Sequence, residues 1–313
     1  MSTARGEGHA NYSDWLKPSS GKFLLDVSRI KKTSHIERAT LIGNRVCWNY
    51  FHWTFEALPK LLSSPGDDPV IVSARMPVQH FQSLALLTDR PVIRLADHEA
   101  LRVDELTLPP SHCYLPDDQK FWGTAAVSRK AVRTVAAAYA GLDQVPAKAN
   151  DILWVSRTPV ALKTGTRDVA NVGEIEALLL SCGAKLFHPH DASLKEQRRR
   201  FESARLVVLP AGAAFSNVVF CQAGTTVIAL AQAKHTDLAS FADIAQALGL
   251  RFAVVYGSSV PNKSPFPAHW DFAICPDALR RALAWADGAG EPDGLVQMTT
   301  LLVAPSAEAE PVF

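Results

Sequence analysis

Short apolar runs alternate along the chain with segments whose apolar residues recur at helical spacing. The apolar runs, many of them β-branched, predict early strands at 22–27 and 39–43 and buried strands at 69–74, 91–96, 151–157, 184–189, 205–210, 225–231 and 251–257. The segments between them predict helices, among them one at 78–87 and the longest at 121–142. Continuous apolar strands that alternate with helices favour parallel sheets covered on both faces. We therefore expect an α/β fold.

A polar stretch at 143–151, which contains proline, interrupts this alternation and marks a boundary between two halves. The expected organisation is a flexible N-terminus at 1–20, a Rossmann-like domain at 21–146, a second Rossmann-like domain at 147–262, a closing strand and helix at 263–290, and a tail at 291–313. Ligands in open α/β sheets bind beyond the carboxyl ends of the strands. The loops to inspect in the second half therefore follow residues 157, 189, 210 and 231.

Two helices of the second half have recognisable N-terminal caps. Asn171 is expected to cap a helix at 171–183. Ser193 and Glu196 have the spacing of a capping box at the start of a helix at 193–204.

Composition narrows the class of protein. The 313 residues carry 32 basic and 31 acidic side chains, a net charge of +1, which indicates no nucleic-acid partner. The five cysteines are widely spaced and form no CxxC pair, as expected of reduced thiols in a cytosolic protein. No apolar run approaches the roughly 20 residues that span a bilayer, and the polar N-terminus does not resemble a signal peptide. We expect a cytoplasmic protein.

Residues 210–217, PAGAAFSN, follow a predicted strand and lead into a short predicted helix at 212–224. A helix N-terminus presents unpaired N–H groups that attract phosphate. The strand at the start of this half ends in Arg157, and the loop after it adds Lys163 and Arg167. Since guanidinium groups bind phosphate bidentately, one interpretation is a diphosphate site. The other is that the two arginines form surface ion pairs.

Several familiar nucleotide and hydrolase motifs do not occur. GAAFSN is not GxGxxG and no acidic residue ends the next strand, so a nicotinamide-dinucleotide site is poorly supported. The chain contains neither GxxxxGK[ST] nor GxSxG, which argues against a P-loop NTPase and an α/β-hydrolase.

His52 and Glu56 stand one helical turn apart in the predicted helix at 49–62. The carboxylate could orient the imidazole and raise its basicity, which suits the deprotonation of a hydroxyl. A simple pair on the helix surface is the alternative.

The basic run at 195–201 favours a solvated helix face, with contact to an anionic membrane surface or a lipid diphosphate as the other interpretation. The histidines at 188 and 190 have no matching carboxylate or cysteine cluster, so no metal site is expected.

Five segments occur in an order that is typical of one enzyme family. They are NYFHWTFEALPKL at 49–61; ILWVSR at 152–157 with Arg167, Asn171 and Glu174 after it; SLKEQRRRFESARLVVLPAGAAFSNVVF at 193–220; GTTVIAL at 224–230; and HWDFAICPDAL at 269–279. Together they resemble glycosyltransferase family 61, in order, over roughly residues 40–285.

The resemblance implies a GT-B-like fold in which two Rossmann-like domains, each with a parallel sheet, face a central cleft. It implies an inverting hexosyl- or pentosyltransferase that needs no bound metal or other cofactor. Its bacterial relatives act in capsule and exopolysaccharide biosynthesis. The partners would be a nucleotide-sugar donor in the C-terminal half and a glycan or lipid-linked glycan acceptor at the N-terminal half. A lipid-linked acceptor leaves peripheral contact with the inner membrane open.

The resemblance also assigns roles to residues. His52 or Glu56 would be the base that activates the acceptor hydroxyl. The implied donor-binding residues are Arg157, Lys163, Arg167, Asn171, Gly212, Ala213, Ser216 and Asn217.

The sequence departs from the family pattern at two polar positions. The histidine before Gly-Ala is replaced by Ala211, and the acidic residue near the end of the following strand is replaced by Ala229. In the relatives these side chains would contact the donor phosphate and ribose. Their absence supports an alternative function, in which the chain is a degenerate, non-catalytic family member that acts as a binding or scaffold subunit in glycan assembly.

Overall fold

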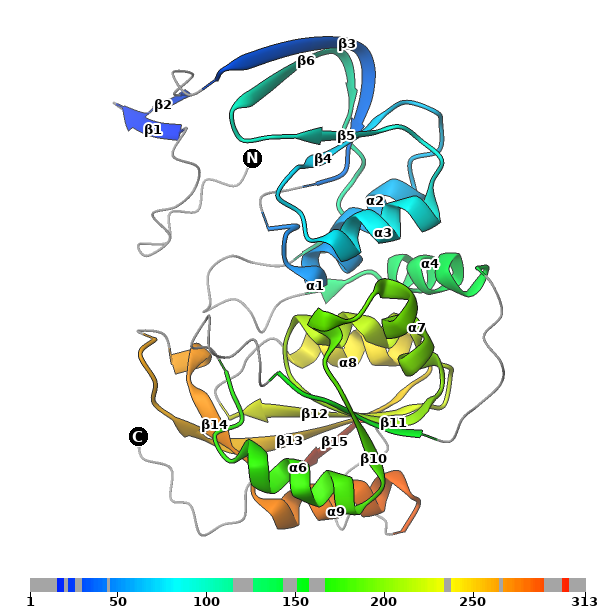
Figure 1. Ribbon diagram of the computed structural model, residues 1–313, viewed down its shortest axis with the longest axis vertical. Coiled ribbons are helices and arrows are strands. Elements are labelled where there is room, and N and C mark those ends of the chain that lie inside the picture. The colour runs from blue at the N-terminus through cyan, green and yellow to red at the C-terminus, as the bar shows by residue number, and fades with distance from the viewer. Residues whose placement is uncertain are drawn as a thin grey trace.

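The computed structural model describes residues 16–19, 22–25, 30–43, 46–114, 126–142, 151–157, 167–233, 238–264, 267–289 and 300–303. Each half of the chain builds a parallel sheet, and helices fill the space between the two sheets (Figure 1). The predicted α/β fold with parallel sheets is confirmed. Of the predicted tail at 291–313, residues 300–303 instead form strand β15 (Thr300–Val303) of the C-terminal sheet. The rest of that tail and most of the stretch at 143–151 lie outside the described residues.

The N-terminal sheet has four parallel strands in the order β5-β4-β3-β6. They are β3 (Lys32–Leu41), β4 (Val70–Ser73), β5 (Val92–Leu95) and β6 (Glu99–Thr107). Residues 96–98 alone separate β5 from β6. So short a connection between parallel strands is possible because the sheet curls and brings its two edge strands into contact (Figure 1). An antiparallel hairpin, β1 (Leu16–Ser19) and β2 (Lys22–Leu25), precedes this sheet.

One long helical segment follows β3 and contains a π-helical turn. It consists of α1 (Tyr50–His52), the π-helix η1 (Trp53–Ala57) and α2 (Leu58–Leu62). Proline has no N–H, so Pro59 cannot bond the carbonyl of Phe55 as an α-helix requires. That carbonyl instead accepts a hydrogen bond from Sγ of Cys113 at 3.4 Å. Burial raises the pKa of the Cys113 thiol to about 12, so the donor proton is retained at neutral pH.

The C-terminal sheet has seven strands, with β10-β9-β11-β12-β13-β14 in order and β15 beside β13. They are β9 (Asp151–Val155), β10 (Ala184–Phe187), β11 (Ala204–Pro210), β12 (Thr226–Gln232), β13 (Arg251–Val260), β14 (Asp271–Ala273) and β15 (Thr300–Val303). All neighbours pair in parallel except β13 and β14. The first strand, β9, lies between β10 and β11, so the strand order reverses there. Such a topological switch point is where doubly wound sheets bind ligands.

Helices cover both faces of the C-terminal sheet. The helices are α6 (Val172–Ser181), α7 (Leu194–Glu202), the 3₁₀ helix η4 (Ala213–Phe220), α8 (Leu238–Ala247) and α9 (Pro276–Ala286). α6 and α9 lie on one face, and α7, η4 and α8 on the other (Figure 1). Strand β11 serves both faces, since Leu206 and Val208 pack toward α6 and α9 while Val207 and Leu209 pack toward α7 and α8. This is why the strand is a continuous apolar run.

A single apolar core continues from one half of the chain into the other. The helices α3 (Val78–Leu87) and α4 (Arg129–Ala140) belong to the N-terminal half, and α4 lies between the two sheets (Figure 1). Phe51 of α1 contacts Phe241 of α8, with ring centroids 5.6 Å apart, and Phe241 stacks on Phe215 of η4 at 4.1 Å. Tyr139 of α4 meets Phe220 edge to face at 4.9 Å.

The structure corrects several element boundaries. The expected strand at 39–43 begins at Lys32, because its first residues are exposed and polar and lack an apolar signal. The expected helix at 121–142 begins at Arg129, and the short strand β8 (Ala126–Val127) precedes it and pairs with β7 (Cys113–Tyr114). The expected helix at 212–224 is a 3₁₀ helix that ends at Phe220.

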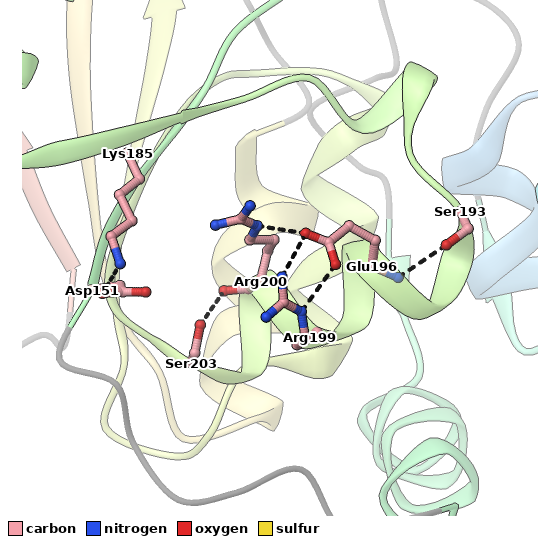
Figure 2. A network of polar contacts seen from close by, with 7 residues as sticks. All are labelled: Asp151, Lys185, Ser193, Glu196, Arg199, Arg200 and Ser203. Carbon is pink, nitrogen blue, oxygen red and sulfur yellow. Dashed lines mark hydrogen bonds and ion pairs between the residues drawn. The ribbon is translucent and has the colours of Figure 1, made fainter.

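Figure 2 shows the start of α7, where half of the predicted capping box is formed. Oγ of Ser193 accepts from the backbone N–H of Glu196 at 3.2 Å. The Glu196 carboxylate does not return to Ser193; it accepts from Arg199 and Arg200, at 2.9 and 2.7 Å from their Nε atoms. The basic run is therefore balanced by carboxylates of its own helix, since Arg198 also pairs with Glu202 at 2.6 Å.

The five cysteines are all free thiols. Among the described residues, no helix is both long and apolar enough to cross a membrane.

Candidate functional site

A cavity of about 390 Å³ opens where the two halves meet. The C-terminal half lines it with residues that follow three neighbouring strands: Arg157 after β9, Pro189 after β10, and Gly212 after β11. The N-terminal half lines it with Tyr50 of α1 and His80 of α3, among others. The cavity therefore lies at the carboxyl ends of the parallel strands, next to the topological switch point.

Arg157 is the cationic side chain of this lining. Burial, and then the nearby charge of Arg167, lower the pKa of the guanidinium, while Asp168 and Asp271 act in the opposite direction. Arginine keeps its proton under any physiological condition. Within the described part of the chain, neither aspartate comes close enough to Arg157 for an ion pair. A partly buried cation in this position favours an anionic ligand.

The turn after β11 brings backbone close to that cation. Gly212, Ala213 and Ala214 all line the cavity, so the N-terminus of η4 faces it. A Cβ atom built on Gly212 would lie 3.0 Å from Nη1 of Arg157. Glycine thus allows the guanidinium to rest against the turn, and both face the same space.

Asn217 provides the second polar feature of the site. Its side chain is fully buried and lines the cavity, yet neither amide atom has a hydrogen-bond partner in the described structure. Leaving a buried polar group unsatisfied costs about 1–3 kcal/mol. Such a group in a cavity wall indicates a water or a ligand that completes its bonds. Ser216 is equally buried, and its hydroxyl also lacks a partner there, but it does not line the cavity.

His80 was not expected from the sequence. It is 2% exposed, and its ring packs against Trp53 at 4.9 Å and Tyr50 at 5.7 Å between centroids. Burial lowers the pKa of the imidazole to about 4, so the ring is neutral at pH 7; the backbone of Cys47 acts in the opposite direction. The available signal was a histidine at a core-facing position of the helix predicted at 78–87.

The predicted pair of His52 and Glu56 is formed, but neither residue lines the cavity. Nδ1 of His52 and Oε1 of Glu56 are 2.9 Å apart, and the imidazole is about one-quarter exposed. His52 is the last residue of α1, which begins one position after cavity-lining Asn49, and Glu56 lies in the π-helix η1 that follows.

Of the other predicted donor-binding residues, Arg167 and Asn171 form hydrogen bonds with the backbone on either side of β14. The N–H of Arg167 donates to the carbonyl of His269 at 3.1 Å. The Asn171 amide donates to the carbonyl of Ile274 at 2.8 Å and accepts from its N–H at 2.9 Å, so it fixes α6 to the end of β14 rather than capping its own helix. Lys163 lies outside the described residues.

The two departures from the family pattern occupy buried positions. The N–H of Ala211 donates to the carbonyl of Leu230 at 2.7 Å. Ala229 is fully buried. It lies in the middle of β12 rather than at its end, since the strand continues to Gln232. The polar residue at the strand end is Gln232, whose amide bonds the carbonyl of Pro267 at 2.6 Å and the hydroxyl of Ser259 at 2.9 Å.

Comparison with protein families identifies the family of the chain. The family described as Glycosyltransferase 61 matches residues 50–228, more than half of the chain. The chain therefore belongs to glycosyltransferase family 61, as the resemblance indicated. The matched region contains both sides of the cavity, including His80, Arg157 and Asn217. Membership implies sugar transfer from a nucleotide-sugar donor to a glycan acceptor in general. No curated protein matches the chain.

Proposed function

We propose that this protein is an inverting glycosyltransferase of the GT-B type, with Rossmann-like halves that face a cleft and a nucleotide-sugar donor bound in the cavity. One observation carries the proposal. A partly buried arginine and a buried amide without a partner line the same cavity at the switch point of a parallel sheet. Phosphate is the group on a nucleotide sugar that a buried guanidinium beside a helix N-terminus recognises.

In this proposal the diphosphate lies between Arg157 and the N-terminus of η4 at Gly212 and Ala213. When the bond between the sugar and the diphosphate breaks, negative charge grows on the leaving oxygen. A guanidinium already held in a buried site stabilises that charge without reorganisation. Lys163 and Arg167 add positive charge around the leaving group. Asn171 and Ser216 support the site from outside the cavity, Asn171 by fixing α6 to the end of β14.

The acceptor hydroxyl attacks the anomeric carbon from the face opposite the diphosphate, which inverts the configuration. His52, oriented by Glu56, takes the hydroxyl proton as the new C–O bond forms. The 2.9 Å contact between the two side chains supports this role, because a carboxylate partner orients the imidazole and fixes which ring nitrogen carries the proton. The reaction needs no bound metal, and the acceptor is a glycan or a lipid-linked glycan of a bacterial polysaccharide, met in the cytoplasm or at the inner membrane.

The test is transfer or hydrolysis with a panel of nucleotide sugars, combined with calorimetry of UDP, GDP and CMP. Arg157→Gln should abolish turnover and weaken nucleotide binding at least tenfold, since charge-assisted hydrogen bonds are worth roughly 1.5–3 kcal/mol. Arg199→Gln is the matched control, because Arg199 is exposed and pairs with Glu196, and neither of the two lines the cavity. Unchanged binding and turnover in Arg157→Gln would rule out this donor site.

The base is tested separately. Glu56→Gln and His52→Ala should each lower kcat with little effect on donor affinity, because neither residue lines the cavity. If both variants keep the wild-type kcat and lose only thermal stability, the pair is structural.

A second candidate function is a non-catalytic binding or scaffold subunit. The observation that favours it is that Ala211 and Ala229 are buried apolar residues where the family pattern has polar ones. Reproducible absence of binding to UDP, GDP and CMP would favour this function over transfer.

A further inference from the structure

Two buried polar side chains face the cavity from opposite halves of the chain. His80 is 2% exposed and Asn217 is 0% exposed, and both line the cavity. Among the described residues, the amide atoms of Asn217 make no hydrogen bond. The imidazole of His80 has a contact with the backbone of Cys47 that falls short of good hydrogen-bond geometry, so at least one ring nitrogen is left without a partner. Polar groups this deeply buried are normally satisfied, so the missing partners point to the occupant of the cavity.

Both groups are uncharged. The amide of Asn217 offers two donors and one acceptor, and a neutral imidazole offers one donor and one acceptor. The pKa of His80 is lowered to about 4 by burial, so the imidazole carries no charge at neutral pH. Neutral donors and acceptors are suited to hydroxyl groups, whereas the anionic part of a ligand is matched by Arg157.

The positions of His80 and Asn217 in the cavity suit contact with the sugar of the donor rather than with its nucleoside. The transferred sugar must be reached by the acceptor, which the proposed function assigns to the N-terminal half. His80 belongs to that half, and Asn217 lies in η4, five residues after Gly212 at the turn that faces Arg157. The space bounded by both residues is therefore the space between the phosphate end and the acceptor half.

We propose that His80 and Asn217, one from each half of the chain, bind hydroxyl groups of the donor's sugar and determine which sugar is accepted. The proposal rests on the proposed function, because it assumes a nucleotide-sugar donor in this cavity. It adds a residue from the acceptor half to the recognition of the donor.

The experiment compares the affinities of sugar nucleotides with those of the bare nucleotides. UDP-glucose, UDP-galactose, UDP-xylose and GDP-mannose are titrated by calorimetry beside UDP and GDP, on wild type, Asn217→Leu and His80→Leu. Each variant should raise the Kd of the sugar nucleotides about threefold to tenfold per lost hydrogen bond and leave the Kd of the bare nucleotides within twofold. His80→Gln, which keeps a neutral donor and acceptor, should recover part of the loss.

Controls separate the possible failures. Tyr139→Phe removes another buried hydroxyl, one that lies outside the cavity lining, so it should leave every Kd unchanged. An equal loss of sugar-nucleotide and bare-nucleotide binding in Asn217→Leu and His80→Leu would place these residues on the nucleoside or phosphate and overturn the inference, as would no loss at all. If wild type binds none of the six ligands, the proposed function itself fails and the inference fails with it.

Discussion

The guanidinium of Arg157 rests against the α-carbon of Gly212, so that a Cβ atom at position 212 would stand 3.0 Å from Nη1. This is closer than ordinary van der Waals contact, and Gly212→Ala must therefore displace the arginine by a few tenths of an ångström. The backbone of Gly212 is extended, with φ 165°, so alanine introduces no backbone strain. We expect weaker binding of UDP or GDP in calorimetry with little change in thermal stability.

Gly173→Ala is the matched control for that prediction. Gly173 lies in α6, and a Cβ atom there would have no neighbour within 4 Å. Alanine in a helix should stabilise the fold by about 0.5–1 kcal/mol and leave nucleotide binding unchanged. Equal binding by both glycine variants would show that the position of Arg157 does not matter to the ligand.

The unsatisfied amide of Asn217 predicts a gain in stability when it is removed. Asn217→Leu has similar volume and leaves no buried polar group without a partner, so the free energy of unfolding should rise by about 1 kcal/mol. This corresponds to an increase in Tm of roughly 2–4 °C for the ligand-free protein, measured by calorimetry. A fall in Tm would mean that the amide contributes to the fold and is not reserved for a ligand.

His80 makes stability depend on pH. The pKa of a histidine is about 6.5 in an unfolded chain, and burial lowers it to about 4 in the folded protein. Between these values the unfolded state binds a proton that the folded state does not, so stability is fully present above pH 6.5 and declines toward pH 4. The contribution is of the order of 3 kcal/mol.

Urea titrations of wild type and His80→Gln at pH 7 and pH 4.5 measure this effect. The variant should lose less free energy of unfolding than wild type over the same interval. Identical pH dependence of the two proteins would contradict a buried, neutral His80.

The contact between Cys113 and Phe55 predicts a coupling between distant positions. Cys113→Ala removes the donor to the Phe55 carbonyl and should cost about 1 kcal/mol. Pro59→Ala supplies a backbone N–H that can bond the same carbonyl. In a double-mutant cycle, the cost of Cys113→Ala should therefore be smaller in the Pro59→Ala background. Additive effects of the two changes on the free energy of unfolding would exclude the coupling.

Much of the fold could be predicted because its signals are local. The strands of the C-terminal sheet are buried on both faces, so β11 and β12 are continuous apolar runs that sequence inspection finds directly. The start of β3 could not be found this way, because its first residues are exposed and polar. The π-helical turn at Trp53–Ala57 was not predicted either, and its Phe55 carbonyl accepts a hydrogen bond from Cys113, which lies far away in sequence.

The candidate site was predictable on one side only. Arg157 and the turn at Gly212 follow neighbouring parallel strands of one sheet. Because such strands end at the same edge, the sequence alone predicts that the two lie close together. His80 comes from the other half, and its arrival in the cavity depends on how α3 packs against the C-terminal half. Asn171 illustrates the opposite case. Its position before a helix suggested a cap, whereas both the nitrogen and the oxygen of its amide form hydrogen bonds with the backbone of Ile274.

The apolar core that runs through Phe51, Phe241 and Phe215 has a consequence for how the molecule opens. Swinging the two sheets apart about a hinge would expose these stacked rings to water, at a cost proportional to the apolar area uncovered. Ligands are then expected to enter and leave through movements of the surface segments around the cavity mouth. Because the two halves share one apolar core, we expect that neither half folds on its own. Heating should produce one cooperative transition rather than two.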